Sequence, residues 1–176
     1  KLIRKLKREN IQGLVLDLRR NGGGSLEEAV SLTGLFIRRG PVVQTKNADG
    51  EMAIASDPDP SEAYAGPLIV LTSRLSASAS EILAGALQDY GRALIVGDPS
   101  TFGKGTVQTV VNLDAMARSD KPRLGEVKMT VAQFYRVNGG TTQLRGVTPD
   151  ILLPTLRNAK SGEAGLDNPL PWGQIK

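Results

Sequence analysis

Three short apolar runs, each followed by a turn of glycine or small polar residues, most constrain how this chain can fold. The runs cover residues 13–18, 67–72 and 92–97, and the first two lead directly into helical patterns. Apolar runs of this length between turn residues are typical of buried strands. Alternating patterns follow at 107–113 and 127–137 and indicate antiparallel strands. The sequence therefore predicts an α/β fold (α+β mixed), with a central sheet and flanking helices.

The predicted helices have recognisable ends. Residues 1–10 carry apolar side chains at helical spacing between cations, and residues 81–89 form a second helical stretch. Ser25 is a suitable N-cap for a helix that ends at Gly40. Residues 47–66 are rich in Asp, Pro and Gly and predict an exposed connection between strands.

The amino-acid composition excludes several kinds of chemistry. The chain has no histidine and no cysteine, so it holds neither a Ser–His–Asp triad nor a thiolate nucleophile, and a zinc site would need carboxylates alone. Much of the formal charge of +4 comes from cations in residues 1–8, with no interleaved aromatic residues. This pattern predicts a solvated helix face and no nucleic-acid partner. No apolar run approaches a membrane span, so no stable membrane insertion is expected, and no signal peptide opens the chain.

A glycine-rich turn and a serine-rich turn follow the first two apolar runs. The turn at 21–24 can present backbone N–H groups to an anion or a developing oxyanion, or it can be a flexible turn. Ser76, Ser78 and Ser80 alternate with alanine, and one of them can be an exposed nucleophile on a strand-to-helix bend. Ser80, which precedes Glu81, is also a candidate helix N-cap.

A third loop places Lys104 between two glycines. A phosphate-binding loop would need Ser or Thr after this lysine and a helix beyond it, and the sequence has neither. Taken together, the three loops supply a serine nucleophile, a lysine base whose pKa burial would lower, and backbone donors for an oxyanion.

The combined motifs resemble the carboxyl-terminal processing proteases, peptidase family S41, and most of all their tail-specific branch. The residues that carry this resemblance are 16–19, 21–24, 76–81, 88–93, 101–108, 145–150 and 167–172.

The resemblance implies a catalytic Ser–Lys dyad assisted by a glutamine. Ser78 would be the nucleophile, Lys104 the general base, and Gln108 the group that holds the lysine amine in line. Residues four apart on a strand face the same side, which is compatible with that role for Gln108. The oxyanion hole would combine the N–H of Ala79 with that of Gly23, or with its neighbour Gly22 or Gly24. Neither a cofactor nor a metal ion is expected.

The resemblance also implies a crotonase-like core. Residues 1–154 would form the serine protease catalytic core, and residues 155–176 an irregular C-terminal extension. The PDZ domain, early strands and signal sequence of the family are expected to be missing, as in a fragment.

The implied function is that of a periplasmic endopeptidase in the bacterial cell envelope. Its partners would be protein or peptide substrates with nonpolar C-termini, with an envelope adaptor protein as a further candidate. Two other interpretations remain open: a catalytically inert scaffold fragment, and a crotonase-type acyl-CoA enzyme.

Overall fold

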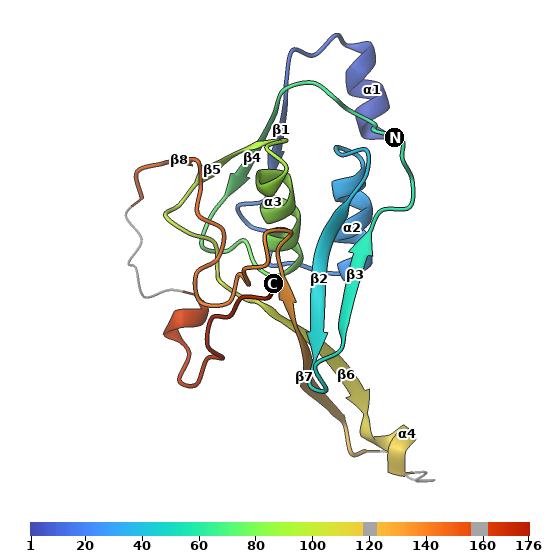
Figure 1. Cartoon of the computed structure of the whole chain (residues 1–176), viewed down its shortest axis with the longest axis vertical. Coiled ribbons are helices and arrows are strands. Elements are labelled where there is room, and N and C mark those ends of the chain that lie inside the picture. The colour runs from blue at the N-terminus through green and yellow to red at the C-terminus, as the bar shows by residue number, and fades with distance from the viewer. Residues whose placement is uncertain (118–122, 156–161) are drawn as a thin grey trace.

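The strands of this chain form two four-stranded sheets, as the computed structural model in Figure 1 shows. The structure describes residues 1–117, 123–155 and 162–176. The parallel sheet has the order β1 (Leu14–Asp17), β4 (Leu68–Thr72), β5 (Leu94–Gly97) and β8 (Ile151–Leu152). The antiparallel sheet has the order β3 (Met52–Ser56), β2 (Pro41–Asn47), β7 (Glu126–Tyr135) and β6 (Thr106–Asn112).

The parallel sheet contains the three apolar runs, which confirms their prediction as strands. Val70 in β4 and Ile95 in β5 are fully buried, whereas Val15 in β1 and Leu94 in β5 are at least half exposed, so one face of this sheet packs on the core and the other is partly open. At the end of β5, a Cβ on Gly97 would lie 2.0 Å from the carbonyl oxygen of Thr72, so only glycine fits there.

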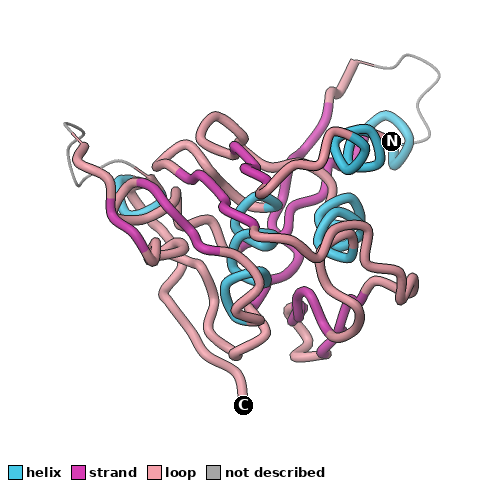
Figure 2. The backbone as a smooth tube through the Cα atoms, turned by 90° about the horizontal axis from the view of Figure 1, so that it is seen from above, coloured by secondary structure: helices cyan, strands magenta, loops and turns pink. Residues whose placement is uncertain are grey.

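Two helices fill the space between the sheets. Helix α2 (Leu26–Gly34) packs against α3 (Ala79–Asp89), and α3 contacts β5 of one sheet and β2 of the other. Figure 2 shows helices in the interior of the molecule, with strands on more than one side. Ser25 caps α2 as predicted, because its Oγ accepts the N–H of Glu28 at 3.3 Å. The mixed α/β class is confirmed, and the structure adds that the sheet is divided in two.

Helix α1 (Leu2–Arg8) confirms the predicted N-terminal helix, and β6 and β7 are the predicted antiparallel strands, which pair with each other. Their ribbon extends away from the body of the molecule and carries α4 (Leu113–Ala117) near its tip (Figure 1). The sequence did not indicate this short helix.

The region 47–66 is not simply an exposed connection, because it contains strand β3, which pairs antiparallel with β2. Four of the five residues in β3 are exposed. Residues 52–55 are apolar without alternating with polar residues, and Asp, Pro and Gly surround them, so the sequence did not show the alternation of a half-buried strand. Asn47 makes the turn, since its Oδ1 accepts the N–H groups of Asp49 and Glu51 at 3.0 and 2.9 Å.

The predicted C-terminal extension, 155–176, lies partly outside the described residues, which omit 156–161. Its described part contains a 3₁₀ turn, η1 (Glu163–Gly165), and a β-bridge between Gly140 and Gln174.

A buried carboxylate fastens α3 to the loop after β5. Glu81 in the first turn of α3 is fully buried. Its Oε1 accepts hydrogen bonds from the Thr101 hydroxyl and from the Gly103 N–H at 2.7 Å. Its Oε2 accepts the N–H groups of Ser78 at 2.7 Å and Lys104 at 3.0 Å. Burial raises the pKa of Glu81 from 4.5 to about 7, although these hydrogen bonds to the carboxylate act in the opposite direction.

This chain should become less stable as the pH rises from about 4.5 to about 7. The folded state holds the Glu81 proton more tightly than the unfolded state does, so this stability is present below pH 4.5 and is lost as the pH rises through about 7. The linked change in the free energy of unfolding is about 3 kcal/mol. Urea unfolding at several pH values measures it, and no histidine in the chain titrates in the same range.

Glu81→Gln should abolish this pH dependence and lower stability at acid pH, because its NH₂ group would face backbone donors. Glu27→Gln, at an exposed position of α2, is the matched control and should keep the wild-type dependence. Equal pH dependence in wild type and Glu81→Gln would contradict this role of the carboxyl group.

Candidate active site

The three alternating serines have different surroundings. The Ser76 side chain is fully buried, and its hydroxyl donates to the Leu18 carbonyl oxygen at 2.7 Å. The Ser80 hydroxyl donates to the Asn21 carbonyl oxygen at 2.9 Å. Ser78 is half-buried and lines a cavity. Of the three, Ser78 is therefore the serine that can meet a ligand in that cavity.

Ser80 is not the N-cap of α3, because the helix begins at Ala79 and the N-cap is Ser78. The prediction failed because the signal is Ser78 with Glu81 three residues later, the spacing of a capping box, and not Ser80 with its neighbour. Ser78 has a φ of 56°, which is rare for a residue with a side chain. Strained backbone of this kind is found at functional sites, where the surrounding structure holds it in place.

The cavity in front of Ser78 has a volume of about 410 Å³. It is lined by residues from the turn before α2, the start of α3, the loop after β5 and the β6–β7 ribbon: Gly22, Gly24, Ser25, Leu26, Ser78, Ala79, Ile82, Lys104, Thr106, Val107, Gln108, Lys128 and Phe134. The fold thus brings the predicted serine, lysine and glutamine to one cavity.

Lys104 is half-buried, and burial lowers the pKa of its amine below 10.5. Its Nζ donates to the carbonyl oxygen of Thr106 at 2.6 Å. Across the described residues, no hydrogen bond joins this amine to the Ser78 hydroxyl. The two groups share the cavity, but the dyad hydrogen bond is not formed in this arrangement.

Gln108 lines the cavity, but it does not share one regular strand with Lys104 as expected. Lys104 precedes β6, which begins at Thr106, so the two residues do not lie on one regular strand. The pairing with β7 also shifts here, because Val107 pairs with Ala132 and Gln108 pairs with Thr130, which leaves an extra residue in β7. Gln108 is exposed, and none of the hydrogen bonds in the described ranges links it to the lysine amine.

Gly23 is the glycine of the 21–24 turn that lies against the serine loop. A Cβ on Gly23 would lie 2.8 Å from the Cβ of Ser78 and 3.1 Å from the Ala79 nitrogen, whereas nothing lies that near Gly22 or Gly24. Its φ of 104° also favours glycine.

The two predicted oxyanion donors differ in whether their N–H groups already have a hydrogen-bond acceptor. The Gly23 N–H donates to Asn21 Oδ1 at 2.9 Å, so the Asn21 side chain occupies it. The Ala79 N–H, at the first position of α3, has no acceptor within the part of the chain that the structure describes. The involvement of Asn21 was not predicted, although an asparagine at the start of a turn commonly accepts the N–H two residues farther on, and this signal could have indicated it.

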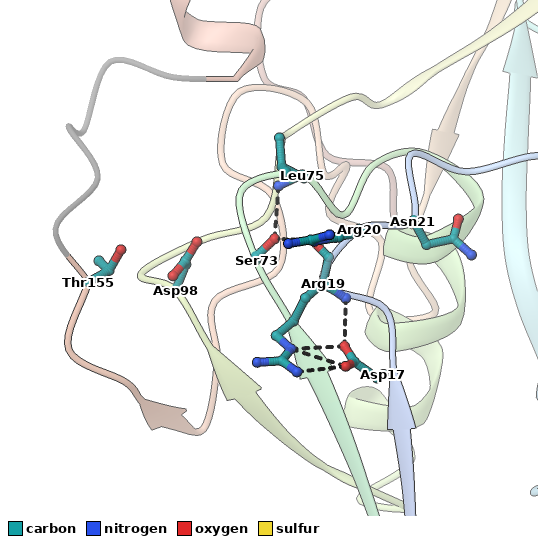
Figure 3. A pocket seen from close by; sticks show the side chains of 8 residues that line it. All are labelled: Asp17, Arg19, Arg20, Asn21, Ser73, Leu75, Asp98 and Thr155. Carbon is teal, nitrogen blue, oxygen red and sulfur yellow. Dashed lines mark hydrogen bonds and ion pairs between the residues drawn. The ribbon is translucent and has the colours of Figure 1, made fainter.

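A larger cleft of about 720 Å³ lies at the carboxyl ends of the parallel strands (Figure 3). Arg19 and Asp17 point toward each other there, with Arg19 Nη2 2.7 Å from Asp17 Oδ2. The hydrogen bond from Arg19 lowers the pKa of Asp17 to about 2. The lining of this cleft includes neither Ser78 nor Lys104, so it is separate from the cavity with the predicted catalytic residues.

Within residues 1–117, 123–155 and 162–176, no cluster of three or more acidic side chains is placed to hold a metal ion. No helix in those ranges has the length and apolar character needed to cross a bilayer.

Comparison with known proteins identifies the family. The model of "Peptidase family S41" matches residues 1–153. A tail-specific protease of Haemophilus influenzae is 49% identical over 99% of this chain, and a carboxy-terminal-processing protease of Bartonella bacilliformis is 40% identical over 85%. The chain spans 25% and 32% of the lengths of these two relatives.

A solved structure, a photosystem II D1 C-terminal processing protease, has the same fold. It superposes with a TM-score of 0.69 at 38% identity, over 85% of this chain and 36% of that chain. These findings confirm the family resemblance that the motifs indicated. They also confirm the fold that this resemblance implied. The chain belongs to peptidase family S41.

Proposed function

We propose that this chain carries the acyl-transfer centre of a serine endopeptidase, with Ser78 as nucleophile and Lys104 as general base. The observation that carries the proposal is that the half-buried serine on a strained turn opens onto the same cavity as a half-buried lysine whose pKa is lowered. Family membership and the names of the relatives support the same reaction class.

In the proposed reaction, neutral Lys104 takes the proton of the Ser78 hydroxyl as the Oγ attacks the carbonyl carbon of the scissile peptide bond. Backbone N–H groups of Ala79 and of a glycine, Gly23 or one of its neighbours Gly22 and Gly24, stabilise the oxyanion. The lysine then donates the proton to the leaving amine, and water hydrolyses the serine ester.

The reaction requires two local changes from the arrangement described above. The Lys104 amine has to leave the Thr106 carbonyl and turn toward Ser78. If Gly23 is the second oxyanion donor, the Asn21 side chain has to release its N–H. Gln108 lines the same cavity and would hold the amine after the first change.

We further propose that the substrates are proteins with nonpolar C-termini in the bacterial envelope, with an adaptor protein as a candidate partner. The names of the tail-specific and carboxy-terminal-processing relatives support action at a protein's C-terminus, while its nonpolar character, the envelope and the adaptor follow from the family resemblance alone. An inert scaffold is a second candidate, because the Ser78–Lys104 hydrogen bond is not formed. Cleavage and fluorophosphonate labelling of the wild-type protein and Ser78→Ala distinguish the protease from the scaffold.

Ser78→Ala should reduce cleavage of an unfolded protein with a nonpolar C-terminus on the order of 10³-fold, because the acyl-enzyme loses its attachment point. It should also abolish labelling by a fluorophosphonate, measured as a mass increase on the intact protein. Ser31→Ala, at an exposed position of α2, is the matched control and should change neither. Wild-type protein that neither cleaves nor reacts would favour the scaffold.

Turnover should rise with pH as Lys104 loses its proton, because only the neutral amine accepts hydrogen from Ser78. Burial lowers the pKa of this lysine, so the acid limb of kcat should lie below the 10.5 of an ordinary lysine. Lys104→Arg should be inactive at every pH tested, since a guanidinium stays charged. The exposed Lys46→Arg should match wild type, and substantial turnover by Lys104→Arg would rule out the lysine as base.

A further inference from the structure

The C-terminal segment 162–172 packs against the loop that carries Lys104. The Glu163 N–H donates to the Phe102 carbonyl oxygen at 2.9 Å. A Cβ on Gly162 would lie 2.5 Å from the same oxygen, so the two backbones are in direct contact. Farther along, the Trp172 indole N–H donates to the Thr141 carbonyl oxygen at 2.9 Å. The segment therefore has a defined place beside the proposed site.

A buried amide connects this segment to the lysine loop. Gln143 is fully buried. Its Oε1 accepts the N–H of Gly105 at 2.8 Å, and its Nε2 donates to Glu163 Oε1 at 3.0 Å and to the Leu170 carbonyl oxygen at 3.2 Å. A donor on one side and a carboxylate on the other fix the orientation of the amide. Removal of either partner would leave a buried polar group unpaired.

The two glycines that flank Lys104 fit closely against residues 141–144. A Cβ on Gly105 would lie 2.4 Å from Thr141 Oγ1, and one on Gly103 would lie 3.0 Å from the carbonyl carbon of Leu144. The Thr142 hydroxyl donates to the Lys104 carbonyl oxygen at 3.0 Å.

Leu144, next to the buried amide, has a φ of 66°, an unusual value for a residue with a side chain. Its N–H donates to the Gly103 carbonyl oxygen at 2.8 Å. The backbone here is strained and fixed by neighbours, as is typical of residues that support a functional site.

The charges around the lysine amine act in opposite directions. Burial lowers the pKa of Lys104 and is the largest influence. The negative charges of Glu163 and Glu81 raise it, and the positive charge of Lys128 lowers it. Glu163 is nearly buried, so water screens its charge less than that of a surface acid.

We propose that Gln143 and Glu163 are positioning residues for Lys104. Gln143 holds the lysine loop through the Gly105 N–H, and Glu163 fixes the Gln143 amide and places a negative charge near the amine. This inference rests on the proposed function, in which Lys104 is the base. It gives part of the predicted irregular extension a role in the active site.

Glu163→Gln tests the charge and keeps the hydrogen bond, because an amide oxygen can still accept from Gln143. The titration of the Lys104 side chain should move to lower pH, measured by ¹³C NMR on the lysine Cε signal that is missing from Lys104→Ala. The acid limb of kcat should move in the same direction, with KM unchanged. A purely structural role would lower kcat at every pH and would move neither titration.

Gln143→Met tests the connection, since it keeps the length of the side chain but removes the acceptor for Gly105 and the donor for Glu163. We expect kcat to fall about tenfold or more with little change in KM, because a small displacement of the base weakens proton transfer. Circular dichroism and thermal unfolding check that the variant is folded. If it is not, Gln143→Glu takes its place with the same expected fall in kcat, because it keeps the acceptor for Gly105 and removes the donor for Glu163.

Asp167→Asn is the matched control, because it removes one negative charge from an exposed position of the same segment. It should behave as wild type. The inference is overturned if the Lys104 titration is the same in wild type and Glu163→Gln, or if folded Gln143→Met keeps wild-type kcat. The NMR titration does not depend on turnover, so it gives its answer even if Ser78→Ala retains activity and the proposed function fails.

Discussion

The carboxylate of Glu81 accepts hydrogen bonds from two backbone segments that lie far apart in the sequence. One is the turn at Ser78, and the other is the loop from Thr101 to Lys104. A buried charge is costly unless hydrogen bonds replace its hydration. Donors satisfy both carboxylate oxygens, but burial outweighs them and raises the pKa of Glu81 to about 7. The relative position of the proposed nucleophile and base therefore depends on one carboxylate that accepts the backbone N–H groups of both residues.

The sequence was a good guide where the signal is local. Ser25 caps its helix as its position indicated, and the apolar runs form the parallel sheet. It was a poor guide where distant segments meet. Nothing near Gln143 in the sequence indicates that its amide would bind Gly105. The strand Met52–Ser56 does not alternate apolar with polar residues and lies among turn residues, so its sequence did not reveal it.

The candidate site was predictable in its residue types more than in its geometry. The motifs indicated Ser78 and Lys104, and the fold brings both to one cavity. The motifs did not indicate that the lysine amine would donate to Thr106, or that Asn21 would accept the Gly23 N–H, although a turn asparagine favours the second bond. Both are side-chain choices among nearby partners, and small differences in hydrogen-bond energy decide them.

The same contacts explain how the proposed site would respond to its substrate. Desolvation is the largest influence on the Lys104 amine, and the amine is only half-buried while the cavity is open. A peptide in the cavity would exclude water and strengthen every charge interaction there. Further burial would favour the neutral amine, against the opposing pull of Glu163 and Glu81. The proton affinity of the base would thus depend on occupancy of the cavity, through the balance between burial and these two carboxylates.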